Sequence, residues 1–170
     1  MSVKKFKLVK SDKTTWYGKP LFQVKALKDF SIFKKGELGG FIEKEANLSQ
    51  DGDAWVSGDA WVSGDARVSG NARVSGDAWV YGDAWVYGDA LVSGDARVYG
   101  DAWVYGDAWV SGNAWVYGNA RVYGDAWVSG KVKVDFVLCS RFGFETQAQV
   151  NLWLKKEKEF EVEVKKLKEK

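Results

Sequence analysis

One six-residue pattern of small, apolar and polar positions repeats without interruption through the centre of the chain. It has the form Gly-(Asp/Asn)-Ala-x-Val-(Ser/Tyr) and recurs thirteen times from Gly52 to Ser129. Ala and Val lie two residues apart, so an extended backbone points both to one side and points x and Ser/Tyr to the other. The pattern predicts short strands whose Ala and Val side chains form the interior.

The x position indicates that the other side of each strand faces outward. It holds Trp in eight copies, Arg in four and Leu in one. An interior shared by indoles and unpaired guanidinium groups is excluded, because burying an uncompensated charge is too costly. We therefore expect a surface location for Trp55, Trp61, Arg67, Arg73, Trp79, Trp85, Leu91, Arg97, Trp103, Trp109, Trp115, Arg121 and Trp127.

The Ser/Tyr position predicts how the copies are arranged. Six residues make too short a strand to be stable alone, so the copies must stack as coils of a solenoid, with neighbouring strands about 4.8 Å apart. Every eighteen residues, one column is entirely Ser and the other two change from Ser to Tyr after the first coil. The columns are Ser57, Ser75, Ser93, Ser111 and Ser129; Tyr81, Tyr99 and Tyr117; and Tyr87, Tyr105 and Tyr123.

Four copies per coil is the alternative to three, because the Trp/Arg position has a weaker period of twenty-four residues. Four copies would stack Arg73, Arg97 and Arg121 on one another, and like charges at that spacing repel. Three copies place Arg97 between Trp79 and Trp115 instead, where a guanidinium group can stack on indoles. We predict a triangular prism of about five coils.

The repeat resembles the hexapeptide repeat of left-handed parallel β-helix proteins through its Val-x-Gly-(Asp/Asn)-Ala-x phrase. The upstream stretches FQVKALKDF and GELGGFIEKEANLSQDGDAW resemble the amino-terminal region of hexapeptide-repeat proteins of bacteria and their phages, some of which are named as acyltransferases. The positions that carry this second resemblance are Asp29, Phe30, Gly39, Gly40, Asn47, Leu48 and Ser49. The predicted fold is an all-β solenoid, a triangular left-handed parallel β-helix with 18 residues per coil; its handedness is implied by the resemblance.

Both ends of the repeat are expected to carry caps, because open solenoid edges pair readily with other chains. An N-terminal β-hairpin cap is predicted over residues 1–38, from the alternating stretches 3–10 and 20–28. The hexapeptide-repeat β-helix is predicted over residues 39–138, with Val132, Val134 and Phe136 continuing the inward pattern.

The last segment, residues 139–170, is predicted to be a C-terminal cap that is helical from about Thr146. One apolar helical face is expected to hold Val150, Trp153, Leu154, Phe160, Val164 and Leu167. The all-Ser column is the one corner without Tyr rings, so we expect this segment or a neighbouring subunit to pack there.

The composition argues against catalysis. The resemblance implies a His base, as in hexapeptide acyltransferases, or three His ligands to zinc, as in the similar carbonic anhydrases, and the 170-residue chain contains no His. The sequence also contains no zinc-ligand cluster, nucleophile triad or phosphate-binding loop of the usual spacing. We predict a protein that is not an enzyme, with no catalytic residues, no metal and no cofactor.

The column of Asp and Asn residues after each glycine is expected to cap its own corner by hydrogen bonding, as Asx turns do. Asn replaces Asp at Asn71, Asn113 and Asn119. Collection of cations such as calcium by the stacked carboxylates is the alternative, although the nine-residue calcium pattern is missing.

The outward aromatic rows suggest the function. They could form a ladder that only stabilises the solenoid, an interface between two or three copies of the chain, or a surface for another protein, a nucleotide, single-stranded nucleic acid or a sugar. We predict a non-catalytic scaffold that self-associates or binds a partner through these rows. The candidate residues are Trp55, Trp61, Trp79, Trp85, Arg97, Trp103, Trp109, Trp115, Arg121 and Trp127, with Tyr81, Tyr87, Tyr99, Tyr105, Tyr117 and Tyr123.

The remaining features favour a cytoplasmic protein of a bacterial cell, encoded by the bacterium or by a phage. The single Cys139 forms no intramolecular disulfide, and the opening MSVKKFKLVK lacks the apolar core of a signal peptide. No apolar run reaches the length of a membrane span. A net charge of +2 does not by itself indicate nucleic acid.

Overall fold

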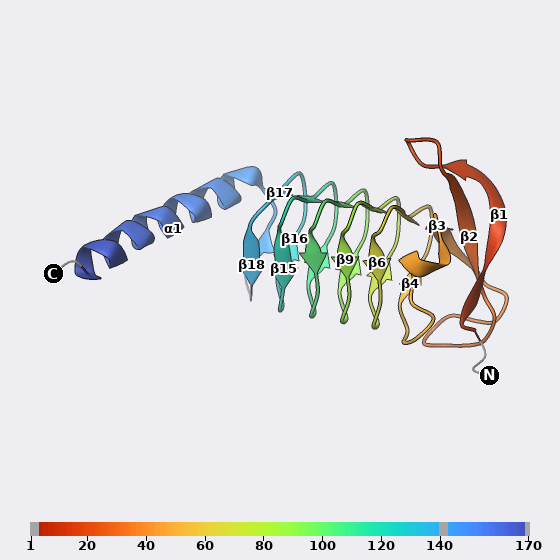
Figure 1. Cartoon of the computed structure of the whole chain (residues 1–170). Helices are drawn as coiled ribbons and strands as arrows, with labels where there is room; N and C mark the ends of the chain where they lie inside the picture. Colours follow the sequence, from red (N-terminus) through yellow and green to blue (C-terminus); the bar gives the residue numbers. More distant parts are fainter. Residues whose placement is uncertain (1–3, 140–142, 169–170) are drawn as a thin grey trace.

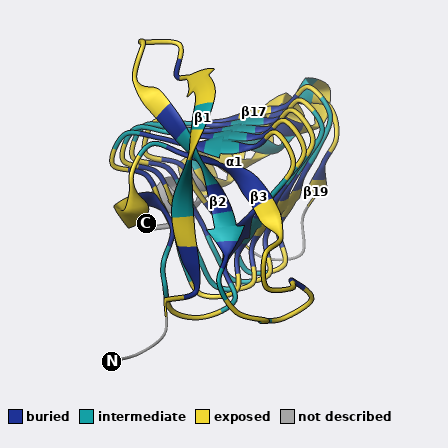
Figure 2. Cartoon of the chain, turned by 90° about the vertical axis from the view of Figure 1, so that its right-hand side faces the viewer, coloured by how far each residue is buried: buried dark blue, intermediate teal, exposed yellow. Residues whose placement is uncertain are grey.

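The chain forms a parallel β-solenoid with a β-hairpin at one end and a helix at the other (Figure 1). The structure is a computed structural model that describes residues 4–139 and 143–168. Viewed from the hairpin end, the solenoid has three sides around a buried interior (Figure 2). This is the architecture predicted from the repeat.

Three sheets run along the solenoid, one on each side. The first contains β1 (Phe6–Thr14), β2 (Pro20–Ala26), β3 (Leu38–Ile42), β5 (Trp61–Val62), β8 (Trp79–Val80), β11 (Arg97–Val98), β14 (Trp115–Val116) and β17 (Lys133–Val134). The second contains β4 (Trp55–Val56), β7 (Arg73–Val74), β10 (Leu91–Val92), β13 (Trp109–Val110), β16 (Trp127–Val128) and β19 (Gly143–Phe144). The third contains β6 (Arg67–Val68), β9 (Trp85–Val86), β12 (Trp103–Val104), β15 (Arg121–Tyr123) and β18 (Val137–Cys139).

The strand register confirms three copies per coil. Arg97 pairs with Trp79 on one side and with Trp115 on the other, each eighteen residues away. The solenoid has about six coils, so the prediction of about five was too low. The difference arises because β3 precedes the repeat and pairs in parallel with β5, while β17, β18 and β19 add strands after it.

The Ala and Val residues of the repeat form the interior, as predicted. Each of them is at most 1% exposed. Transfer of one such Val side chain from water contributes roughly 1.5–3 kcal/mol, so the stacked columns supply the main driving force for folding. Backbone hydrogen bonds between coils, such as the one from the Arg97 amide to the Ala114 carbonyl at 2.8 Å, fix the spacing of the columns.

The glycine of each repeat forms the corner between two sides. These glycines have φ between +61° and +74°, a left-handed conformation that costs other residues energy. They also stack closely on one another. A Cβ placed on Gly88 would lie 2.9 Å from the Gly106 amide nitrogen, whereas a Cβ on Gly118 would meet nothing within 4 Å.

The N-terminal cap is the predicted hairpin followed by one irregular coil. β1 and β2 pair antiparallel, β2 pairs antiparallel with β3, and the short 3-10 helix η1 (Glu45–Asn47) leads into the repeat. The cap covers Trp55, which is 1% exposed and lies against the rings of Phe6, Phe30 and Phe33 at centroid distances of 6.4, 5.2 and 5.4 Å. The prediction that Trp55 is a surface residue is therefore wrong.

Lys5 closes the first coil from inside the cap. Its side chain is buried, and Nζ donates hydrogen bonds to the carbonyl oxygens of Ala54, Gly52 and Asp51 at 2.9, 3.1 and 3.4 Å. The ammonium group also lies 5.4 Å from the centroid of the Phe30 ring. Burial lowers the pKa of Lys5 from 10.5 to about 8.

The C-terminal segment forms the helix α1 (Gln147–Lys168), which covers the end of the last coil. Val150 is buried there, and Trp153 stacks on Phe136 with a centroid distance of 5.2 Å. Beyond this contact the helix extends away from the solenoid (Figure 1), and Phe160 is exposed. The predicted helix is confirmed, but its side chains do not form one packed face along the whole length; those of Val164 and Leu167 lie outside the described residues.

The helix packs on the last coil and not along the all-Ser column, which was one of the two expected arrangements; the other, a neighbouring subunit at that column, stays a prediction. Because it leaves the solenoid from the end of β19, its first turns seat on the exposed interior of the last coil, where Val150 and Trp153 find apolar partners. The part of the chain that the structure describes contains no helix with the length and apolarity needed to span a membrane.

We predict that a side chain at a corner glycine is disfavoured twice, by the positive φ angle and by the backbone of the next coil. Gly88→Ala should lower the free energy of unfolding by about 2–4 kcal/mol, because strain and a backbone clash add, and Gly118→Ala by about 1–2 kcal/mol, from strain alone. Urea unfolding followed by circular dichroism measures both. Equal losses in the two variants would contradict the role of corner stacking.

Titration of Lys5 should make the protein more stable in mild alkali. Between about pH 8 and pH 10 the unfolded chain holds the Lys5 proton and the folded chain has released it, so the free energy of unfolding rises with pH, by at most about 1.4 kcal/mol per pH unit. Urea midpoints at pH 7.5, 8.5 and 9.5 measure the trend. Lys5→Met should remove it, and a trend unchanged in that variant would assign it to other groups.

Candidate functional site

The outward residues divide the solenoid into three faces with different surfaces. We call the side formed by β5, β8, β11, β14 and β17 the Arg97 face, the side formed by β6, β9, β12, β15 and β18 the Trp103 face, and the side formed by β4, β7, β10, β13, β16 and β19 the Ser face. On each face the x residue and the Ser/Tyr residue two positions later form neighbouring columns.

The Arg97 face carries a continuous ladder. The rings of Trp61 and Trp79 meet edge to face with centroids 4.5 Å apart. The Arg97 guanidinium carbon lies 4.3 Å from the Trp79 ring centroid and 5.2 Å from that of Trp115. The Lys133 ammonium group follows, 4.8 Å from the Trp115 centroid. Guanidinium and indole alternate here because each stabilises the other.

The Tyr column beside this ladder covers its flank. The rings of Tyr81 and Tyr99 stack with centroids 4.9 Å apart, and those of Tyr99 and Tyr117 stack at 5.5 Å. Tyr99 also meets the Trp115 ring edge to face at 6.3 Å. Burial raises the pKa of Tyr81 and of Tyr99 above the ordinary value, so both phenols are protonated at neutral pH.

The Trp103 face repeats this arrangement. Trp85 and Trp103 stack with centroids 5.4 Å apart, and the Arg121 guanidinium carbon lies 4.7 Å from the Trp103 centroid. The Tyr column stacks beside them, with Tyr87 4.9 Å from Tyr105 and Tyr105 4.8 Å from Tyr123. On both Tyr-bearing faces, much of the aromatic surface is therefore in contact with other rings or with cations of the same chain.

The Ser face differs from the other two because its apolar column has no Tyr column beside it. Leu91, Trp109 and Trp127 are 38%, 47% and 40% exposed and follow one another along it. The two indoles stack with centroids 6.1 Å apart, and Trp109 Nε1 donates a 3.4 Å hydrogen bond to Ser93 Oγ. Because the neighbouring column is Ser, no ring covers the flank of these side chains. The sequence-predicted residues are therefore not equivalent: three exposed apolar side chains follow one another on this face, whereas on the Tyr-bearing faces Trp85 is the one repeat Trp of comparable exposure, at 40%.

The Asp and Asn residues of the repeat do not cap their own corners, so the predicted Asx turns are wrong. Within residues 4–139 and 143–168, the repeat carboxylates bond instead to Lys13, Lys44 and Asn71. The corner is satisfied by the backbone of the next coil, as in the 3.0 Å bond from the Asp77 amide to the Gly94 carbonyl. The carboxylates are left on the surface. No group of three or more potential metal ligands occurs in the described ranges.

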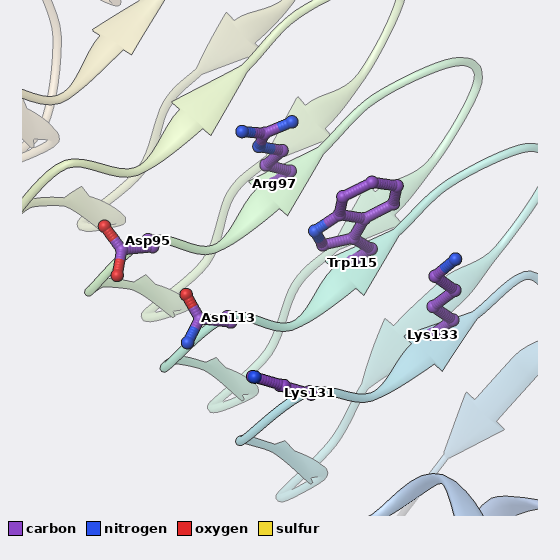
Figure 3. A pocket seen from close by; sticks show the side chains of 6 residues that line it. All are labelled: Asp95, Arg97, Asn113, Trp115, Lys131 and Lys133. Carbon is purple, nitrogen blue, oxygen red and sulfur yellow. The ribbon is translucent and has the colours of Figure 1, made fainter.

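The end of the Arg97 face near the helix differs from the rest of the solenoid. A depression of about 610 Å³ is lined there by Asp95, Arg97, Asn113, Trp115, Lys131 and Lys133 (Figure 3). Lys131 occupies the corner position that holds Asp in most coils, and Lys133 occupies the x position. Neither lysine was among the candidate residues predicted from the sequence, although the break in the Asp column at Lys131 was a signal that could have identified them.

The Arg97 stack should contribute to stability. Arg97→Leu keeps a residue that the repeat accepts at x but removes a cation held between two rings, and we expect a loss of about 1–2 kcal/mol in the free energy of unfolding. Arg67→Leu is the matched control, because its guanidinium carbon is 5.5 Å from one ring, that of Trp85, and a smaller loss is expected. Urea unfolding measures both, and equal losses would contradict the sandwich.

Comparison with known families supports the solenoid. The family model described as YdcK Beta solenoid repeat matches residues 66–82, 84–100, 92–106, 96–112 and 114–130. These segments lie within residues 66–130, and each is about as long as one coil. No curated protein matches the chain. The chain is therefore a β-solenoid repeat protein, with repeats similar to those of the YdcK family.

Proposed function

We propose that this protein is a non-catalytic interaction scaffold that self-associates through its Ser face. The observation that carries the proposal is the exposure of Leu91, Trp109 and Trp127 on the one face without a Tyr column. Each of these side chains presents up to about 100 Å² to solvent, given that large aromatic residues bury 150–250 Å² when fully covered. Together they form an apolar patch of roughly 300 Å², which is at the lower end of the largest patches on typical monomers, and such patches are often functional.

The borders of the Ser face favour a two-fold arrangement with parallel solenoids. Exposed carboxylates follow the edge before the apolar column, and the Ser hydroxyls follow the edge after it. A two-fold axis along the solenoid brings the carboxylate edge of one copy beside the hydroxyl edge of the other, whereas an axis along the strands would bring carboxylates together. The paired edges consist of Asp89, Asp107 and Asp125 and of Ser93, Ser111 and Ser129.

The apolar part of the predicted interface is small. A standard interface buries about 800 Å² on each partner, and the three apolar side chains supply roughly 300 Å² of that. The rest must come from Ser and Asp columns that remain partly hydrated. We therefore expect a reversible dimer whose population depends on concentration.

Two features of the sequence support a non-catalytic role. Hexapeptide acyltransferases, which the repeat resembles, use a His base, and the chain contains no His. From Gly52 to Ser129 the outward x and Ser/Tyr positions also vary only among Trp, Arg and Leu and between Ser and Tyr, whereas an active site needs a local set of different polar groups. We propose membership of the wider hexapeptide-repeat class on the basis of the repeat, without its chemistry.

Trp109→Arg should prevent dimer formation. Arg already occupies the x position in four copies, so the fold should accept it, but a charge in the centre of the apolar patch would be buried without a partner. Light scattering during size exclusion over a range of concentrations should show the wild type moving from 19.0 kDa toward twice that mass and the variant staying at 19.0 kDa.

Trp61→Arg is the matched control for this experiment. Trp61 lies on the Arg97 face with Phe41 and Trp79 as its partners in register, so the substitution creates no pair of guanidinium groups and should leave dimer formation unchanged. A wild type that is monomeric at every concentration would contradict self-association. Equal loss of mass in both variants would contradict the choice of the Ser face.

A further inference from the structure

The charge of the Arg97 face reverses along the solenoid. The corner column that enters this face holds carboxylates in the first coils, an amide in the next and an ammonium group in the last: Asp59, Asp77, Asp95, Asn113 and Lys131. The x column beside it also ends on a cation, Lys133. Three cationic side chains, Arg97, Lys131 and Lys133, therefore line one depression with a single carboxylate, Asp95 (Figure 3).

Two of these cations, Arg97 and Lys133, are held by an aromatic ring rather than neutralised by acids. Arg97 and Lys133 come from the strands on either side of Trp115 and lie 5.2 and 4.8 Å from its ring centroid. Among the described residues, none of the three cations of this depression takes part in an ion pair. Unpaired positive charges lining a depression attract anions, and stacking on the ring reduces the side-chain freedom lost when an anion binds.

The spacing of the cations favours a long anion. Arg97 and Lys133 lie two coils apart, which is about 10 Å at the usual spacing of neighbouring strands. A single phosphate or sulfate cannot contact both. In the parallel corner row, Asn113 lies at the level between them and Lys131 lies at the level of Lys133, so both can contact an extended ligand (Figure 3).

From this geometry we propose that the helix-proximal end of the Arg97 face binds a small ligand with two or more linked phosphate groups. Arg97, Lys131 and Lys133 contact the phosphate oxygens and Asn113 donates a hydrogen bond from its amide. Nucleoside polyphosphates and inorganic polyphosphate share this chemistry. The binding is independent of the Ser face, which lies on another side of the solenoid.

The same contacts argue against recognition of a base. The cations Arg97 and Lys133 flank Trp115, and Tyr99 meets its edge. A nucleobase therefore cannot stack on this indole without displacing a cation. The site recognises the phosphate chain and not the base, so tripolyphosphate should bind at least as tightly as ATP.

Isothermal titration calorimetry of the full chain with tripolyphosphate tests the proposal. We expect one ligand per chain, with affinity that falls as salt rises from 50 to 300 mM, because the contacts are ionic. Lys131→Asp restores the residue that most coils carry at this corner, so it should leave the fold intact and weaken binding about tenfold or more, through lost attraction and added repulsion. Asp95→Asn should strengthen binding about twofold to threefold.

Arg121→Leu is the matched control, because Arg121 stacks on Trp103 in the same way but has no lysine beside it on the next coil, where Val137 is its partner. This variant should bind tripolyphosphate as the wild type does. No heat of binding, or equal weakening by Arg121→Leu and Lys131→Asp, would overturn the proposal.

Four further ligands show which part of a ligand the site recognises. Adenosine should not bind, and longer inorganic polyphosphate should bind more tightly than ATP. ATP binding more than tenfold tighter than tripolyphosphate would overturn the claim that the base is not recognised. Affinity for single-stranded oligonucleotides that exceeds that for tripolyphosphate and grows with length would replace the small ligand by nucleic acid. Light scattering on Lys131→Asp should still show the dimer, which separates failure of this site from failure of the Ser-face interface.

Discussion

The spacing between coils is the constraint on which the rest of the structure depends. Backbone hydrogen bonds between successive coils hold equivalent residues about 4.8 Å apart, and the buried Ala and Val columns prevent any coil from slipping. Within the repeat, each outward side chain therefore lies beside the residues eighteen positions before and after it. The surface chemistry of the protein follows from what these neighbours are.

This constraint explains why one position accepts both Trp and Arg. At this spacing two indoles can stack, and a guanidinium group can lie on an indole, as Arg97 does between Trp79 and Trp115. Two neighbouring guanidinium groups would repel, and no such pair occurs in the eighteen-residue register. A column of mixed Trp and Arg is therefore stable on a surface. Its value as a binding surface then depends on which residues lie beside it. Tyr covers it on two faces and Ser leaves it open on the third.

Much of the fold could be predicted because the same pattern of inward and outward residues recurs in thirteen copies. The period, the inward Ala and Val and the Arg97 stack all follow from spacing and charge. The burial of Trp55 could not be predicted, because it depends on Phe30 and Phe33, which reach it only through the folded path of the cap. The Asx turns were predicted wrongly because the corner amides already have backbone partners in the next coil.

The candidate surface was predicted only as a set. The sequence identified the outward columns, but the exposure of each side chain depends on its neighbours in the folded chain. Trp109, between Leu91 and Trp127, is exposed, whereas Trp115, between Arg97 and Lys133, is half-buried. The basic depression needed the structure as well, since Arg97 and Lys133 are brought to one ring by the stacking of coils. The signal in the sequence was the all-Ser column in the first case and the change from Asp to Lys at Lys131 in the second, and the structure supplied the position of each.

Hydroxyl-radical footprinting of individual Trp residues at low and high protein concentration tests the central claim most directly. If the Ser face is the surface through which copies meet, oxidation of Trp109 and Trp127 should fall as concentration rises, while oxidation of Trp85 and Trp103 stays constant. Oxidation of all four that does not depend on concentration, or protection that appears first on the Trp103 face, would contradict the account.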